Sequence, residues 1–158
     1  MNSAIHNVAR SFQVGETAPE RRVGPITRTD IVRYAGAGGD FNPIHHDETF
    51  AHRAGFRSVF GHGLLTAGIL SAYATSWLGL AALRKYSVRY VAQVWPGDTL
   101  ILSGRVTTID PQGTQGVQVA CELLVQREAA NGQRQDVLTA TAVAAYDAPG
   151  GHGHAGHT

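Results

Sequence analysis

Charged side chains are scarce in this chain of 158 residues. Only 16% of the residues are charged, and 13 basic residues against 12 acidic ones leave a formal net charge of +1. A typical soluble domain carries about 25% charged residues. The chain has no basic block, so we expect no nucleic-acid partner. A surface this short of charge also suits self-association, and we expect a homo-oligomer.

Cysteine is almost absent, because Cys121 is the only one in the sequence. The chain therefore cannot form an internal disulfide, and it has no CxxC metal or redox motif. A lone thiol fits a reducing compartment. The first residues, 1–13, also lack the apolar stretch of a secretory signal peptide. We expect a cytoplasmic protein.

A run without any charged residue extends from Ser58 to Leu83 and raises the question of a membrane span. Small and polar residues interrupt this run at many positions, among them Gly63 and Thr66. A helix that is apolar on nearly all sides can also form the centre of a soluble core. We predict a buried helix over residues 63–78 and no membrane partner.

The rest of the chain predicts a single α+β domain over residues 1–147. Thr27 and Asp30 form a capping-box pattern that starts one helix, and Asp47 caps a second, short helix that ends before Gly55. Residues 11–83 otherwise indicate helices and loops. Alternating apolar residues then predict strands over 86–94, 100–109, 117–125 and 138–146. One helix followed by consecutive antiparallel strands is typical of the α+β class.

Residues 148–158 are rich in glycine and histidine and predict a flexible tail. Three histidines in it, His152, His154 and His157, can bind a divalent ion adventitiously. We expect no functional metal site there.

The segment from Gly39 to His45, Gly-Asp-Phe-Asn-Pro-Ile-His, contains the residues best suited to catalysis. Asp40 and His45 flank an Asn42-Pro43 step that favours a turn, so both side chains can face one point. A carboxylate and an imidazole around one water form an acid–base pair, since histidine titrates near neutral pH. Taken alone, the motif is also compatible with an ordinary capped turn.

Gly61-His62-Gly63 leads directly into the uncharged helix. The N–H groups at a helix start lack intrahelical acceptors and lie at the positive end of the helix dipole. The Gly63 N–H can therefore hold a developing oxyanion. A glycine-rich turn without any function is the alternative. For His46, His52 and His62 we expect structural or exposed positions.

Together these two motifs resemble the MaoC-type dehydratases, which include the (R)-specific enoyl-CoA hydratases, also called hydratase 2. The resemblance runs from about Phe12 to Tyr146 and includes the segments 12–16 and 96–100. It implies a hot-dog fold, in which a curved antiparallel sheet wraps a long central helix. It also implies reversible addition of water to a trans-2-enoyl thioester of CoA or acyl carrier protein. Gln93 departs from the pattern, because many relatives have proline there.

The resemblance assigns roles at matching positions. Asp40 and His45 would hold and activate the water, Asn42 would orient them or the substrate, and the Gly63 N–H would bind the thioester oxygen. The expected substrate contacts are Ser71, Leu64 and Leu65. Further candidates for an acyl tunnel are Thr66, Ile69, Tyr73, Trp77 and Trp95, and the pair Arg84-Lys85 can approach a CoA phosphate or be simply solvated.

The resemblance implies a homodimer, and the side-chain chemistry needs no cofactor and no metal. The sequence leaves open which of Asp40 and His45 is the base, the acyl chain length and the carrier. Two other functions compete with the hydratase. One is a hot-dog acyl-CoA thioesterase, which would release free thiol. The other is a non-catalytic acyl-thioester binding module, which would tolerate loss of Asp40 and His45.

Overall fold

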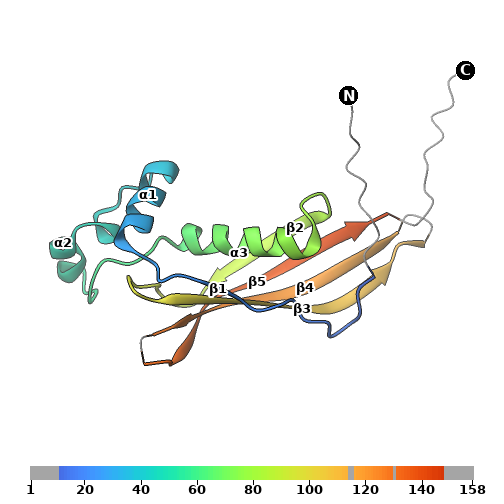
Figure 1. Ribbon diagram of the computed structural model, residues 1–158. Coiled ribbons are helices and arrows are strands. Elements are labelled where there is room, and N and C mark those ends of the chain that lie inside the picture. The colour runs from blue at the N-terminus through green and yellow to red at the C-terminus, as the bar shows by residue number, and fades with distance from the viewer. Residues whose placement is uncertain (1–10, 114–115, 130, 148–158) are drawn as a thin grey trace, which may run out of the picture.

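The computed structural model describes residues 11–113, 116–129 and 131–147. In these residues a short strand and three helical segments precede the long helix, and four strands follow it (Figure 1). The elements are β1 (Arg21–Val23), α1 (Arg28–Gly38), the 3-10 helix η1 (Pro43–His45), α2 (Glu48–Arg53), α3 (Gly63–Leu78), β2 (Leu83–Tyr90), β3 (Thr99–Pro111), β4 (Val117–Glu128) and β5 (Arg134–Tyr146).

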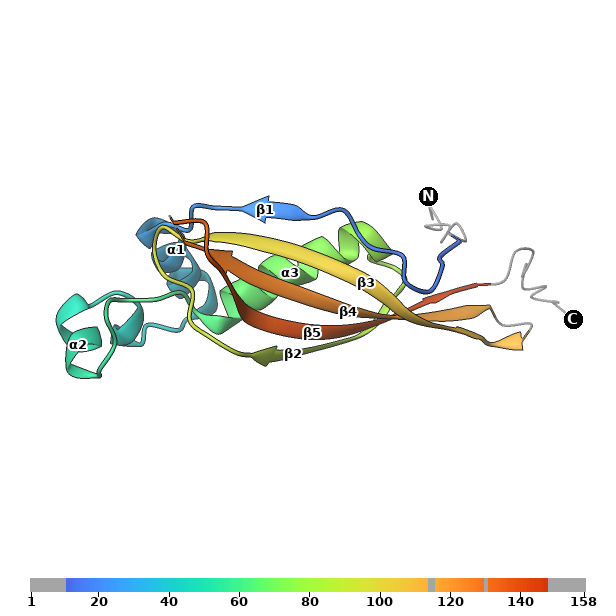
Figure 2. The ribbon, with the colours of Figure 1, turned by 90° about the horizontal axis from the view of Figure 1, so that it is seen from below.

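All five strands form one antiparallel sheet in the order β1-β3-β4-β5-β2 (Figure 2). Strands β3, β4 and β5 follow one another in the chain, and each pairs with the next in antiparallel fashion. Their alternating apolar residues had predicted these strands. The register places Cys121 of β4 between Val106 of β3 and Ala142 of β5, and all three are buried. β1 and β2 form the two opposite edges of the sheet, and β2 pairs with β5. The chain between them includes α3, which therefore crosses the sheet from one edge to the other.

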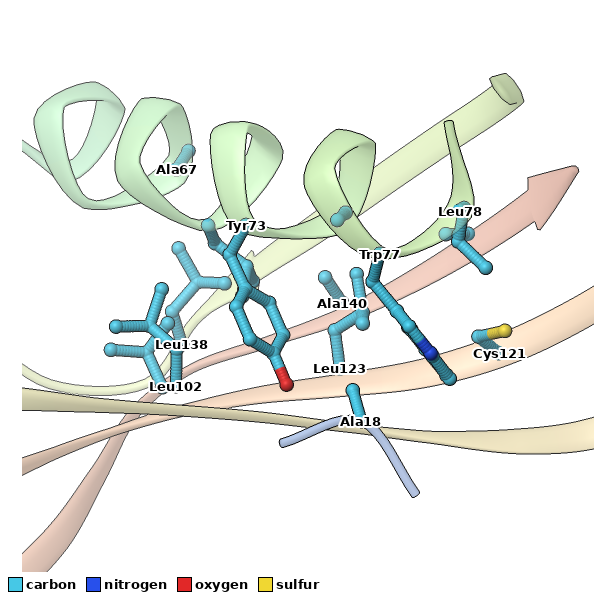
Figure 3. Packing of buried hydrophobic residues seen from close by; sticks show 14 of the residues in the cluster. Ala18, Ala67, Tyr73, Trp77, Leu78, Leu102, Cys121, Leu123, Leu138 and Ala140 are labelled. Carbon is cyan, nitrogen blue, oxygen red and sulfur yellow. The ribbon is translucent and has the colours of Figure 1, made fainter. Parts of the chain in front are cut away.

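α3 lies along one face of the sheet, and this face contains the core (Figures 1 and 3). Leu70, Tyr73 and Trp77 of the helix are at most 6% exposed and pack on Leu102 and Leu123 of the strands. Burial of such a side chain contributes about 1.5–3 kcal/mol, which explains why a helix without charges forms here. The predicted α+β class, with a curved sheet around a long helix, is confirmed.

The helix ends agree with the local sequence signals. The Thr27 hydroxyl accepts a hydrogen bond from Asp30 N–H, and the Asp30 carboxylate accepts one from Thr27 N–H, so the capping box is confirmed. α1 ends at Gly38, and its C-cap Gly39 has a φ of 69°, a left-handed conformation that glycine adopts readily. The Asp47 carboxylate accepts a hydrogen bond from Phe50 N–H and so caps α2 as predicted.

Two predictions about strands were wrong. The segment 11–83 contains β1, which is only three residues long and exists because it pairs with Leu100–Leu102 of β3. β2 starts at Leu83 and ends at Tyr90, so residues 91–94 leave the sheet four residues earlier than alternation predicted. In the described part of the chain no helix is long and apolar enough to cross a membrane. The predicted tail at 148–158 lies outside the described residues.

Candidate active site

The loop between α1 and α2 places Asp40 and His45 on one tight turn. The Asn42 side-chain oxygen accepts a hydrogen bond from Ile44 N–H at 3.2 Å, and the Asn42 N–H donates to Asp40 Oδ1 at 3.3 Å. Pro43 begins the 3-10 helix that ends at His45. Asn42 therefore shapes the turn and restrains the Asp40 carboxylate, and its side-chain oxygen is already occupied by the backbone.

Asp40 and His45 face each other across a gap. His45 Nε2 lies 4.0 Å from Asp40 Oδ2, the carboxylate side chain is 53% exposed, and the imidazole side chain is 8% exposed. This separation is too long for a direct hydrogen bond, but one water can bond to both atoms at once. The structure thus brings together the two side chains that the sequence selected, one of them open to solvent.

The tautomer of His45 follows from its other nitrogen. Nδ1 lies 2.8 Å from the carbonyl oxygen of Phe60. Because a carbonyl oxygen only accepts, Nδ1 must carry the hydrogen and donate it. In the neutral ring Nε2 then has a free lone pair, which faces Asp40. His45 is consequently arranged to accept a proton at Nε2.

Burial lowers the pKa of His45 below its usual value of 6.5, because desolvation disfavours the charged imidazolium. The hydrogen bond to the Phe60 carbonyl and the Asp40 carboxylate raise this pKa, while nearby His62 and His46 lower it. The net lowering keeps His45 neutral at physiological pH, which is the form that can act as a base.

His62 and Gly63 connect this pair to the start of α3. The His62 ring stacks on the His45 ring with centroids 3.8 Å apart and planes inclined by 30°. His62 is the N-cap residue of α3, and Gly63 is the first residue of the helix. The Gly63 N–H therefore lies at the positive end of the α3 dipole, one residue from a ring that contacts the proposed base.

A cavity of about 280 Å³ opens beside Gly63. It lies between the first turn of α3 and the segment that leaves β2, and its lining residues are Phe60, Gly61, Gly63, Thr66, Tyr90, Val91, Ala92, Gln93, Val94 and Val137. A Cβ on Gly63 would lie 2.8 Å from Tyr90 Cε1, so any side chain at this position would displace the Tyr90 ring from the cavity wall. The sequence predicted Tyr90 only as a strand residue. Its place in the cavity wall depends on the contact with Gly63, which is 27 positions away in the chain and has no local signal.

The expected substrate contacts occupy different environments. Leu64 is 63% exposed, Leu65 is half-buried, and neither lines the cavity beside Gly63. The Ser71 hydroxyl donates to the Gly68 carbonyl of its own helix at 2.9 Å. Of the further tunnel candidates, Thr66 lines the cavity, whereas Tyr73 and Trp77 point into the core against the sheet (Figure 3). Their substrate roles stay predictions.

His46 and His52 lie at the surface, as expected, and so does the basic pair Arg84-Lys85, whose contact with a CoA phosphate stays a prediction. His46 Nε2 bonds to the Phe41 carbonyl and His52 Nε2 to the Arg57 carbonyl, and both residues are exposed. Arg84 and Lys85 are exposed on β2, and Arg84 donates to the Ala81 carbonyl.

Asp40, His45 and His62 also form a cluster of possible metal ligands, with one donor atom from each residue within 4.8 Å of the others. His62 Nε2 is 2.9 Å from the Asp40 backbone oxygen and must donate its hydrogen to it. That nitrogen is therefore not available to a metal ion. Two ligands remain, Asp40 and His45, and a stable zinc site usually has three or more protein ligands.

A single antiparallel sheet curved around one long helix defines a class, the hot-dog fold, and solved structures of similar shape support this assignment. One is a complex of ChsH1 and ChsH2 from Mycobacterium tuberculosis, with a TM-score of 0.71 and 26% identity, covering 86% of this chain and 99% of that chain. Another is the (R)-hydratase of A. caviae, with a TM-score of 0.68 and 24% identity, covering 87% and 99%.

The chain belongs to the family described as "MaoC like domain", because the model of that family matches residues 11–128. An (R)-specific enoyl-CoA hydratase of Rhodospirillum rubrum is 35% identical over 89 residues, which are 55% of this chain and 62% of the relative. A 3-hydroxybutyryl-CoA dehydratase of Methylorubrum extorquens is 34% identical over 105 residues, 65% and 66% respectively. The chain thus spans just under two thirds of these relatives.

Proposed function

We propose that this protein is an (R)-specific enoyl-thioester hydratase, which also runs in reverse as a 3-hydroxyacyl-thioester dehydratase. The observation that carries the proposal is the gap of 4.0 Å between His45 Nε2 and Asp40 Oδ2, beside the start of α3. The names of the two relatives above support the same reaction class. The enzyme would be a hydro-lyase.

Water bound between Asp40 and His45 attacks Cβ of the trans-2-enoyl thioester. The pair takes one proton from this water as its oxygen bonds to Cβ, and the pair returns one proton to Cα as the double bond is lost. Because two coupled groups titrate as a unit, the base and acid steps belong to the pair. The bare Nε2 of neutral His45 suits it to the removal of the proton. The thioester C–S bond stays intact throughout.

During the attack, negative charge develops on the thioester oxygen. The Gly63 N–H, at the positive end of α3, is our proposed donor to that oxygen. Loss of one such donor typically costs about 2.7–4 kcal/mol in an enzyme. The cavity beside Gly63 would then receive part of the acyl group, with Thr66 and Tyr90 among its walls. Asn42 would act by holding the turn.

A homodimer is part of the proposal. The sheet has two edges, and β2, with eight residues, offers a much longer edge than β1, with three. An unpaired edge strand readily pairs with a strand of a second chain. We propose pairing between β2 strands, a domain that extends through residue 147, and a cytoplasmic location, which the lone buried thiol of Cys121 supports.

The test is hydration of crotonyl-CoA, followed by loss of the enoyl-thioester absorbance, with the configuration of the product determined by chiral chromatography. We expect (R)-3-hydroxybutyryl-CoA. Asp40→Asn and His45→Gln should each remain folded and lower kcat by about 10²–10⁴-fold, the usual contribution of a general acid or base. Asp136→Asn and His52→Gln, at exposed positions, are the matched controls.

Different results identify the competing functions. Release of free thiol from acyl-CoA without hydration would indicate a thioesterase. Binding of the thioester without turnover of short, longer, branched or carrier-bound substrates would indicate a binding module. Normal turnover by Asp40→Asn or His45→Gln would remove that residue from the mechanism.

A further inference from the structure

His62 is a buried polar residue that the proposed mechanism does not use. Its side chain is 2% exposed, and it connects three parts of the site. Nε2 bonds to the Asp40 backbone oxygen at 2.9 Å, one part of the ring stacks on His45, and the ring also contacts Tyr34 of α1, with centroids 5.0 Å apart. These contacts reach both members of the catalytic pair.

The hydrogen bonding of His62 determines its tautomer. Nε2 carries the hydrogen, because its partner is a carbonyl oxygen. Nδ1 is buried and has no hydrogen-bond partner among the described residues. A hydrogen on Nδ1 would need an acceptor at this position, and a buried N–H without an acceptor is costly. Nε2 therefore carries the ring hydrogen of His62, and the Nδ1 lone pair is enclosed.

The two contacts of His62 act on different halves of the pair. The bond to the Asp40 carbonyl holds the main chain at the point where α1 has ended and the turn begins. The stacked ring covers one face of His45 and, with the Phe60 carbonyl on Nδ1, leaves the imidazole little freedom to rotate. If one of these two contacts is lost, the surrounding structure no longer holds the distance between Asp40 Oδ2 and His45 Nε2 at a fixed value.

We propose that His62 is a positioning residue, which fixes the Asp40 main chain and the plane of the His45 ring so that both groups face one water. This inference rests on the proposed hydratase function. A histidine that merely fills space would be replaceable by another side chain of similar volume, without effect on the protonation of His45.

Two variants separate the contacts. His62→Gln retains an N–H donor for the Asp40 carbonyl and removes the ring, whereas His62→Phe retains a ring for stacking and removes the donor. The matched controls are His52→Gln and His52→Phe, because His52 also bonds a carbonyl through Nε2, that of Arg57 at 3.0 Å, outside the site. Each variant is first checked for a native melting temperature.

The readouts are kcat, KM, the pH profile of kcat/KM, and the titration of His45 by NMR of its ring nitrogens. His62→Phe should lower kcat about ten- to hundredfold at nearly constant KM, as expected for a small misplacement of a catalytic group. His62→Gln should admit water to the face of His45, so that the acidic limb of the pH profile and the NMR titration of His45 both move to higher pH.

The proposal is overturned if both folded His62 variants match their His52 controls in kcat and in the titration of His45. The NMR titration needs no turnover, so it decides the role of His62 even if the wild-type protein hydrates no enoyl thioester. Failure of hydration in the wild type would count against the proposed function alone.

Discussion

At the scale of single residues, the environment of His45 determines when the site can act. Its Nδ1 is committed to the Phe60 carbonyl, and its Nε2 must be unprotonated to take a proton from water. Three titratable groups face it, Asp40 and His46 from its own loop and His62 from the start of α3. Burial is the largest cause of the lowered pKa of His45; His62 and His46 lower this pKa further, and the Phe60 carbonyl and Asp40 raise it.

The first prediction concerns pH. Because the pKa of His45 is lowered, the ring stays neutral until the pH falls below its usual value of 6.5. Protonation then removes the base, so kcat/KM should be constant at neutral pH and decline only below about 6.5. A profile of kcat/KM against pH measures this. An acidic limb centred above 6.5 would contradict the assignment of neutral His45 as the base.

A side chain at Gly63 should disturb the site by displacing the Tyr90 ring. A Cβ there would lie 2.8 Å from Tyr90 Cε1, so in Gly63→Ala the Tyr90 ring must move within the cavity wall. We expect kcat/KM for crotonyl-CoA to fall about ten- to hundredfold. Gly68→Ala is the control on the same helix, since a Cβ there meets nothing within 4 Å. It should retain activity and gain up to about 1 kcal/mol of stability. Equal activities of Gly63→Ala and Gly68→Ala would exclude a role for the contact between Gly63 and Tyr90.

The thiol of Cys121 should be inert in the native protein. It is 1% exposed, and burial raises its pKa to about 11, so almost no thiolate is present at neutral pH. Ellman's reagent should therefore react with Cys121 only after denaturation. Rapid reaction of the native protein would contradict this burial. The same property keeps the protein's own thiol out of an assay for thioesterase activity.

At the scale of elements, the contact between α3 and the sheet depends on a missing side chain. Gly104 of β3 lies beneath Trp77 of α3 and beside Leu123 of β4. A Cβ at this position would be 2.8 Å from Leu123 Cδ2 and 3.0 Å from a ring carbon of Trp77. Both neighbours belong to the closely packed core, which leaves little room for adjustment.

Gly104→Ala should consequently destabilise the fold by overpacking, by about 1–3 kcal/mol. The free energy of unfolding in urea measures the effect. Ser103→Ala is the control, because successive strand residues alternate between faces and Gly104 faces Trp77, so Ser103 faces away from α3. Its replacement should change stability by less than about 0.5 kcal/mol. Equal stabilities of the two variants would show that the helix can move away from β3 at little cost.

At the scale of the whole molecule, the sheet has one short edge and one long one, and α3 covers only one face (Figure 2). The loop between α1 and α2 and helix α2 lie at one end of α3 (Figure 1). The other face of the sheet has a concavity of about 700 Å³, lined by Ser, Thr, Arg, Asp and Glu side chains together with apolar residues such as Val88 and Leu124. The long edge, β2, is the surface that we expect to pair.

The mass in solution should be twice that of one chain, as measured by light scattering after gel filtration. If β2 pairs with its copy in antiparallel fashion, equivalent residues lie close to the twofold axis. Among Lys85→Cys, Ser87→Cys and Arg89→Cys, at least one variant should form a disulfide-linked dimer, whereas Ser103→Cys on β3 should not. A monomeric mass, or linkage only through position 103, would contradict pairing at β2.

Much of the fold was predictable because its signals are local. The capping pair Thr27 and Asp30, the Asp47 cap and the alternation in β3–β5 depend on neighbours in sequence, and the structure contains them all. β1 was not predictable, because three residues become a strand only by pairing with β3. The early end of β2 has the same origin, since alternation continues after pairing with β5 has stopped.

The sequence by itself determined that Asp40 and His45, the proposed catalytic pair, lie together, because the Asn42-Pro43 turn joins them over a few residues. Only the tertiary structure decided the tautomers of His45 and His62 and the place of Tyr90 against Gly63. Each depends on a carbonyl or a ring contributed from at least 15 positions away. Such contacts are set by the packing of α1, α3 and β2, which no local pattern encodes.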